Sequence, residues 1–196
     1  STEMGVEIAS IGIQVHGGMG YIEETGAAQT LRDVRITTIY EGTTGIQSND
    51  LIGRKVGRDR GAAMFALLDD MTRELEALPA TAAASATTAA LTGVADLRAS
   101  TESLLQSLGS APDRAMAVSV PYLRLCGIVI GGWLLAKSAA IAAERIAGQT
   151  TDSEFFSAKL RSAHFYAEQI MPMAGALARI VQSGAASVVE TDAAHI

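Results

Sequence analysis

Apolar residues recur at helical spacing through the last part of the chain. From Phe156 to Val181 the spacings alternate between four and three, which is the pattern of a helix that packs along one seam. The seam consists of Phe156, Leu160, Ala163, Ala167, Ile170, Ala174, Leu177 and Val181. Alanine-rich runs favour helices, and the β-branched and aromatic residues that strands require are not concentrated in alternating runs. The sequence therefore predicts an all-α fold, built as a helical bundle.

Other segments carry the same kind of pattern. The first helix of the chain has an apolar face made of Met4, Ile8, Ile11 and Val15. We expect a helix over residues 64–78 that Pro79 closes, a linker or frayed start over residues 80–86, and a helix over residues 91–108. A long helix over residues 113–146, with a kink or restart near Pro121, should lie at the centre of the bundle. Its glycines at 127, 131 and 132 predict a close approach of another helix.

Two expected helix starts carry a capping box, in which a Ser or Thr is followed three residues later by Glu or Gln. One is Thr151-Asp152-Ser153-Glu154, before the seam. The other is Thr44-Gly45-Ile46-Gln47, so a helix should begin near Gly45. Residues 36–40 are rich in β-branched side chains and are expected to be extended, which delivers Glu41 to a turn directly before this helix. A carboxylate and a helix end that attracts anions thus lie side by side.

Composition excludes several classes of protein. The chain is 48% hydrophobic and 18% charged, as expected of a packed protein. Its formal charge of -6 offers no basic face for nucleic acid. The single cysteine, Cys126, fits a reducing compartment, so we expect a cytoplasmic protein. Arg124 and Lys137 interrupt the most apolar run, so no membrane span is expected.

Near the N-terminus, Gly17, Gly18 and Gly20 form a loop that frees the backbone for close ligand approach. Taken alone, this loop is more often a simple helix end than a binding site. His16 has no metal-type spacing with the other histidines, so no metal is expected. A short helix should follow over residues 25–35, with its arginines solvated or ion-paired.

The two motifs Gln14-Val15-His16-Gly17-Gly18-Met19-Gly20-Tyr21 and Tyr40-Glu41-Gly42-Thr43-Thr44-Gly45-Ile46-Gln47 resemble, in this order, the C-terminal end of a flavin-dependent acyl-CoA dehydrogenase. The resemblance covers residues 3–60. The tail is similar to the extra helical region of the longer branch of that family, which includes the methylmercaptopropionyl-CoA dehydrogenases. Two domains are therefore predicted. Residues 1–60 would be part of the dehydrogenase helical domain, and residues 61–196 an additional bundle.

The resemblance implies a role for each motif residue. Glu41 would be the general base that removes a proton from the carbon next to the thioester, and Tyr40 and Gly42 would help to hold the substrate. The residues implied to contact FAD are Gln14, Val15, His16, Gly17 and Gly18, which serve a neighbouring subunit, and Thr43, Thr44 and Gly45. Many family members have a longer polar residue at the position of Gly45, so a side-chain contact with flavin is lost there.

The implied partners are an acyl-CoA thioester, an electron-transfer acceptor protein and further copies of the chain. The family's N-terminal helical and middle β-domains are absent from this sequence, so we expect the 196-residue chain alone to be inactive and to bind no FAD. Two alternatives remain open. The chain could be the equivalent piece of an acyl-CoA oxidase, or a helical assembly module without catalytic function. Acyl chain length and shape are not predicted by any pattern in the sequence.

Overall fold

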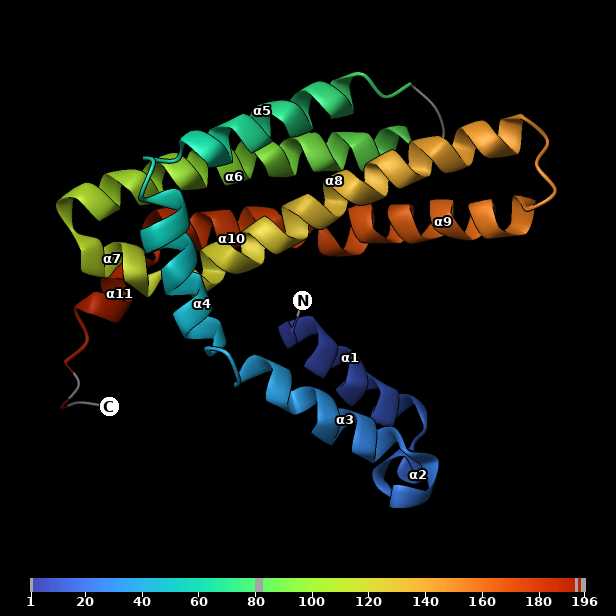
Figure 1. Ribbon diagram of the computed structural model, residues 1–196, viewed down its shortest axis with the longest axis horizontal. Coiled ribbons are helices and arrows are strands. Elements are labelled where there is room, and N and C mark those ends of the chain that lie inside the picture. Colours follow the sequence, from blue (N-terminus) through green and yellow to red (C-terminus); the bar gives the residue numbers. More distant parts are fainter. Residues whose placement is uncertain (1, 80–82, 193, 195–196) are drawn as a thin grey trace. The chain divides into compact units, whose positions relative to one another are not determined.

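The structure is a computed structural model that describes residues 2–79, 83–192 and 194. All regular elements in this part of the chain are helices, which confirms the predicted all-α fold (Figure 1). The chain divides into two compact units, Ser1–Ser48 and Asn49–Ile196. Part of the expected linker, residues 80–82, lies outside the described residues.

The first unit is built on two helices that pack against each other. Its elements are α1 (Thr2–Val15), α2 (Gly18–Tyr21), the 3-10 turn η1 (Glu23–Thr25), α3 (Ala27–Arg35), the 3-10 turn η2 (Ile36–Thr38) and the start of α4 (Thr44–Asp50). α1 packs along α3, and Gly5 lies close to the Val34 side chain. The predicted helix over residues 25–35 begins at Ala27, and Arg32 is ion-paired with Glu23 at 2.9 Å.

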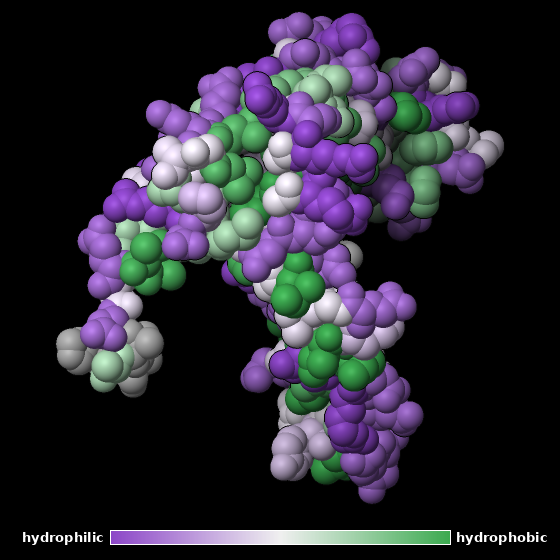
Figure 2. All heavy atoms as spheres, turned by 60° about the vertical axis from the view of Figure 1, so that its left-hand side comes forward, coloured by the Kyte–Doolittle hydropathy of each residue, from purple (hydrophilic) through white to green (hydrophobic). Residues whose placement is uncertain are grey.

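The predicted apolar face of α1 is exposed. Met4, Ile8, Ile11 and Val15 are 49%, 63%, 54% and 79% exposed. Apolar residues are visible on the surface of this unit in the lower part of Figure 2. The first unit therefore has a helical hydrophobic pattern but little core of its own.

The second unit is a bundle of long helices (Figure 1). Its elements are the π-helical segment η3 (Leu51–Val56), α5 (Ala62–Glu76), α6 (Ala84–Ser110), α7 (Pro112–Ala117), α8 (Ser119–Ala147), α9 (Ser153–Phe165), the π-helical segment η4 (Tyr166–Ile170), α10 (Pro172–Ser183) and α11 (Ala185–Val189). α5 confirms the predicted helix that ends before Pro79. Leu68, Met71 and Leu75 of α5, and Leu97 and Leu104 of α6, are fully buried.

α8 is the central helix of this bundle, as predicted. It packs against α5, α6, α9 and α10, and its buried residues run from Ser119 to Ala142. The helix restarts at Val118, so the break lies three residues before Pro121, which the first turn of α8 accommodates. Burial raises the pKa of the Cys126 thiol to about 12, which makes it an inert part of the core.

By length and composition alone, α8 could also cross a membrane. Arg124 and Lys137 interrupt the apolar run of this helix, so α8 has no uncharged stretch of about 20 residues. Half of the most apolar window is buried inside the structure, as in the core helix of a globular bundle. The absence of a membrane span therefore stays a prediction.

Glycines on α6 and α8 make room for the side chains of Tyr166, in η4, and of Met171, the residue that follows η4. A Cβ atom added at Gly93 or Gly132 would collide with the Met171 side chain. One added at Gly131 would collide with the hydroxyl of Tyr166. The predicted close approach is thus confirmed for two of the α8 glycines, although side chains fill the space. The expectation is wrong for Gly127, which has no neighbour within 4 Å of such an atom, because that position faces outward.

From Leu160 to Val181 the predicted seam is confirmed as the inner face of α9, η4 and α10, whereas Phe156 is half-buried and lies outside the core cluster. Its members are all buried or half-buried. The helix changes to π-helical hydrogen bonding at Tyr166–Ile170, just before Pro172, which cannot donate a backbone N–H. The predicted capping box before α9 is wrong in its bonding, since Asp152 occupies the N-cap and makes no side-chain capping bond.

The side chain of Asp59 caps the N-terminal end of α5. The Asp59 carboxylate accepts hydrogen bonds from the backbone N–H groups of Gly61, at 3.0 Å, and Ala63, at 2.9 Å. Arg54, in the basic cluster before α5, pairs with Asp50 through two hydrogen bonds of 2.6 and 2.9 Å. α4 runs across the division of the chain at Ser48, and the predicted domain boundary near residue 60 stays a prediction.

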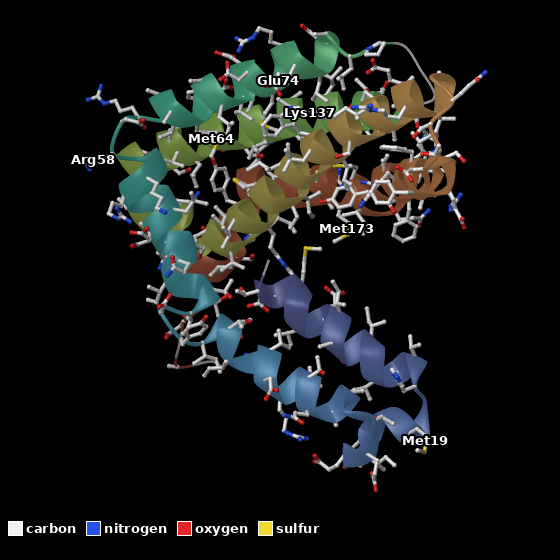
Figure 3. The ribbon with its side chains drawn as sticks, turned by 45° about the vertical axis from the view of Figure 1, so that its right-hand side comes forward. Met19, Arg58, Met64, Glu74, Lys137 and Met173 are labelled. Atoms are coloured by element: carbon white, nitrogen blue, oxygen red, sulfur yellow. The ribbon has the colours of Figure 1, made fainter. Side chains whose placement is uncertain are left out.

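A polar cluster ties α5 to α8 (Figure 3). Lys137 Nζ and Trp133 Nε1 donate to Glu74 Oε2, at 2.6 and 3.1 Å. The hydrogen bond from Lys137 is the largest cause that lowers the pKa of Glu74, and partial desolvation opposes it. Folding lowers the pKa of Glu74, so the cluster stabilises the fold fully at pH values above 4.5, the ordinary pKa of the side chain. This stabilisation is lost as the pH falls through the lower pKa of the folded state.

We predict that Glu74→Gln reduces the loss of thermal stability between neutral pH and acid. The amide keeps the shape of the side chain but has no charge to lose. The measurement is the melting temperature of both proteins over a series of pH values from neutral to below the pKa of Glu74. Glu76→Gln is the matched control, since Glu76 is exposed on the same helix. Equal acid sensitivity in the Glu74 variant and the unchanged protein would contradict the prediction.

Candidate functional site

The segment that leads to Glu41 is a compact turn. Residues 36–40 were predicted to be extended, which is wrong: Ile36–Thr38 is a 3-10 turn. The backbone N–H groups of Ile39 and Tyr40 both donate to the Ile36 carbonyl, at 2.9 and 3.0 Å. The hydroxyls of Thr37 and Thr38 donate to preceding carbonyls as well, at 2.7 and 3.2 Å. These local hydrogen bonds override the β propensity of the side chains.

Glu41 and Gly42 both adopt positive φ angles. The values are 54° and 96°, so the chain passes through two left-handed residues in succession. This conformation suits glycine but is uncommon for glutamate, and such strain gathers at functional sites. Glu41 is exposed, and its carboxylate has no hydrogen bond or ion pair with the other residues that the structure describes. The turn therefore presents an unpartnered carboxylate.

The start of α4 is capped one residue earlier than predicted. Thr43 is the capping residue, because its Oγ1 accepts a bond of 3.4 Å from the backbone N–H of Ile46. Thr44 is the first helical residue, and its hydroxyl donates to Glu3 Oε1 at 2.5 Å. Gln47 reaches back to the Glu41 carbonyl, at 2.6 Å, instead of to the capping residue. The predicted helix start is confirmed, and the predicted capping box is wrong.

A cleft of about 460 Å³ opens beside this turn, within the first unit. Its walls come from the start of α1, the end of α3 and the start of α4. They are formed by Glu3, Val6, Arg35, Thr38, Ile39, Thr43, Thr44 and Gly45. The three predicted flavin contacts of the second motif thus line one cleft. Glu3 and Arg35 also line the cleft, and neither was predicted to be a site residue. Glu3 and Thr44 are 41 positions apart, so their contact has no local pattern in the sequence.

The first motif forms the exposed end of α1. The predicted cofactor contacts Gln14, Val15, His16, Gly17 and Gly18 are all exposed. His16 Nδ1 lies 2.9 Å from the Gly12 carbonyl, and Gly17 has a φ of 62°. A Cβ atom added at Gly17 or Gly18 would meet nothing within 4 Å. The loop therefore offers an open backbone surface.

The two motifs lie at opposite ends of α1. Glu3 contacts Thr44 at one end, and the first motif begins at Gln14, close to the other end. A rise of 1.5 Å per residue separates them by roughly 18 Å. The structure therefore brings together residues 43–45 in one place and residues 14–18 in another, but does not unite the two sets. Among the described residues, no group of three or more His, Cys, Asp or Glu side chains could hold a metal.

Known family models match this chain over nearly its whole length. The model described as acyl-CoA dehydrogenase, C-terminal domain, matches residues 1–56, and the model described as acetyl-CoA dehydrogenase C-terminal like matches residues 60–192. The chain belongs to the acyl-CoA dehydrogenase family. Its predicted resemblance to the C-terminal part of the long branch is confirmed.

Three relatives illustrate the match. The 3-methylmercaptopropionyl-CoA dehydrogenase of Ruegeria pomeroyi is 48% identical over 87% of this chain and 29% of its own length. The broad-specificity linear acyl-CoA dehydrogenase FadE5 of Mycobacterium tuberculosis is 29% identical over 93% of this chain and 31% of its own length. The caffeyl-CoA reductase-Etf complex subunit CarC of Acetobacterium woodii is 42% identical over 27% of this chain and 14% of its own length. The chain thus spans about three-tenths of the first two relatives.

We predict that Gly20→Ala loosens the first motif. A Cβ atom there would collide with the Ile13 carbonyl, so the loop must shift away from α1. The expected cost is about 1 to 3 kcal/mol, the range for overpacking. Hydrogen exchange of the amides at the end of α1 measures it. Gly18→Ala is the matched control, with a change within about 0.5 kcal/mol, and equal protection in both variants would show that the contact is not tight.

Proposed function

We propose that this chain supplies the catalytic base of an FAD-dependent acyl-CoA dehydrogenase, and that Glu41 is that base. In this reaction the Glu41 carboxylate takes a proton from the carbon next to the thioester, and the product is a trans-2-enoyl-CoA. When bound, FAD accepts the hydride that leaves the neighbouring carbon. The observation that carries the proposal is the exposed carboxylate on a left-handed turn, which has no partner among the described residues, in a chain of this family.

The geometry of the turn suits a base. A general base must reach the proton that it removes, without a competing hydrogen bond of its own. Tyr40 is 53% exposed beside Glu41, and Gly42 has no side chain, so both leave space for a substrate next to the carboxylate. Glu41 is open to water in this chain. Other parts of the complete protein would have to exclude water from it.

Two surfaces of the first unit fit an extended cofactor such as FAD. Thr43, Thr44 and Gly45 line the cleft beside the turn, where hydroxyls and backbone N–H groups can bind polar groups. The open backbone at Gly17 and Gly18 can approach a phosphate closely. Because these surfaces lie at opposite ends of α1, we propose that they hold different parts of the cofactor, or cofactors of two subunits.

The proposed partners follow from the family and from the surface. The substrate is an acyl-CoA thioester, because the relatives are named for acyl-CoA substrates. One relative is named as a subunit of a complex with Etf, which supports an electron-transfer protein as the acceptor. The exposed apolar face of α1 supports burial against other protein surfaces, including further copies of the chain. We propose a cytoplasmic location, since the only cysteine, Cys126, is free and buried.

We predict that Glu41→Gln, in the complete protein that contains this chain, lowers acyl-CoA turnover by about 100-fold or more, the usual cost of losing a general base. The amide keeps the shape of the side chain and cannot accept the proton. Turnover is measured with an artificial electron acceptor, and FAD content by absorbance. FAD content should be unchanged. Glu7→Gln, at another exposed glutamate of the first unit, is the matched control and should keep full turnover.

The same assay separates the alternatives. Activity above about a tenth of normal in Glu41→Gln would overturn the assignment of the base. Fast turnover with oxygen as the only acceptor would identify an oxidase in place of a dehydrogenase. No turnover in the unchanged complete protein, with any acyl-CoA, would favour an assembly module.

We also predict that the 196-residue chain alone retains no FAD. Its two candidate surfaces are about 18 Å apart along α1, so each would bind only part of the cofactor. The chain is incubated with excess FAD and desalted, and its visible spectrum is recorded. A flavin band near one per chain would show that the site is complete within these residues.

A further inference from the structure

The side chain of Gln47 is bonded to the backbone of the proposed base. Gln47 Nε2 donates a hydrogen bond of 2.6 Å to the carbonyl oxygen of Glu41, six residues earlier. A carbonyl oxygen can only accept, so the amide nitrogen of Gln47 must be the group that faces it. The bond therefore fixes both the position of the Glu41 carbonyl and the orientation of the Gln47 amide.

Gln47 is itself held by the first turn of α4. Its backbone N–H donates to the Thr43 carbonyl at 2.9 Å. The neighbouring Ile46 is tied to the Thr43 hydroxyl. The amide that reaches Glu41 thus extends from a helix, whose hydrogen bonds restrict the movement of its base.

The turn needs such support because of its conformation. Glu41 has a φ of 54°, which side chains with a Cβ adopt reluctantly. A left-handed glutamate persists only where neighbouring groups determine it. The Glu41 carbonyl belongs to the peptide unit that joins Glu41 to Gly42. The hydrogen bond that this carbonyl accepts from Gln47 therefore opposes a rotation of that peptide unit.

Gly42 leaves room for this bond. A Cβ atom added at Gly42 would lie 3.0 Å from Gln47 Nε2 and 3.3 Å from Ile46 Cγ2. Any larger residue would therefore press on the amide that holds Glu41. The glycine is needed twice, for its φ of 96° and for the space that it gives to Gln47.

We propose that Gln47 is a positioning residue for catalysis: it holds the backbone of Glu41 in the left-handed conformation that aims the carboxylate at the substrate. This inference rests on the proposed role of Glu41 as the base. Gln47 acts only through Glu41, so it should affect proton removal and not the affinity for FAD.

The test uses the complete protein with Gln47→Met, which keeps nearly the same length and loses the N–H donor. A misplaced base can cost about 100-fold, so we expect kcat to fall by about 10-fold to 100-fold with KM little changed. The kinetic isotope effect for substrate deuterated next to the thioester should rise, since proton removal becomes slower. FAD content and melting temperature are measured alongside. Gln29→Met, at an exposed glutamine of α3, is the matched control.

A second variant, Gln47→Glu, distinguishes a positioning role from a purely structural one, because only a positioning role makes the relative kcat of this variant depend on pH. A protonated glutamic acid can donate to the Glu41 carbonyl, whereas the ionised form repels it. Its kcat, relative to the unchanged protein at the same pH, should therefore recover as the pH falls from about 8 toward the ordinary titration range of glutamate. If Gln47→Met does not fold, the pH series of Gln47→Glu is the deciding test. A ratio of its kcat to that of the unchanged protein that stays constant with pH overturns the proposal.

The two proposals fail in different ways. If Glu41→Gln abolishes turnover but a folded Gln47→Met keeps kcat within about twofold, Glu41 stays the base and the positioning role of Gln47 is overturned. If Glu41→Gln retains turnover, the base itself is wrong, and the role of Gln47 falls with it.

Discussion

The left-handed turn at Glu41 and Gly42 is the constraint on which the candidate site depends. Two successive residues with positive φ lie between the 3-10 turn η2 and α4. The glycine accepts this conformation without strain, and the glutamate is held in it by the bond from Gln47. As a result, a carboxylate with no partner among the described residues is presented at a defined place, beside a cleft that the adjoining residues line.

The bundle of the second unit depends on a different kind of constraint. Glycines on α6 and α8 leave spaces that the side chains of Met171 and Tyr166 fill, and Tyr166 also donates to the Ile128 carbonyl at 3.0 Å. Close packing of this kind leaves little room for larger residues at those positions. Among the described residues, the bundle has a continuous buried core of apolar side chains. The first unit differs, because it contains the proposed base Glu41 but buries few apolar side chains.

The first unit leaves the proposed base open to water. A carboxylate that serves as a base needs a substrate pocket and exclusion of water. A cleft opens beside the turn, but Glu41 itself is exposed, and the buried residues among those described in the first unit are small. The apolar face of α1 is exposed as well, as expected for a surface that other protein segments cover. Most of the length of the related dehydrogenases lies outside the region that this chain matches.

The sequence by itself determined the helical class, the seam from Leu160 to Val181, the central place of α8 and the family, since periodicity and contiguous motifs are local properties of a chain. Competing local hydrogen bonds decided three further features, and residue propensities do not predict which of these bonds form. These features are the bonding at the helix starts, the compact turn at residues 36–40 and the exact break before α8. Contacts between distant residues, such as Glu3 with Thr44 and Lys137 with Glu74, have no sequence signal. Only the tertiary structure placed the two motifs at opposite ends of α1 and turned the Gln47 amide toward the Glu41 carbonyl, because both depend on how the backbone folds back on itself.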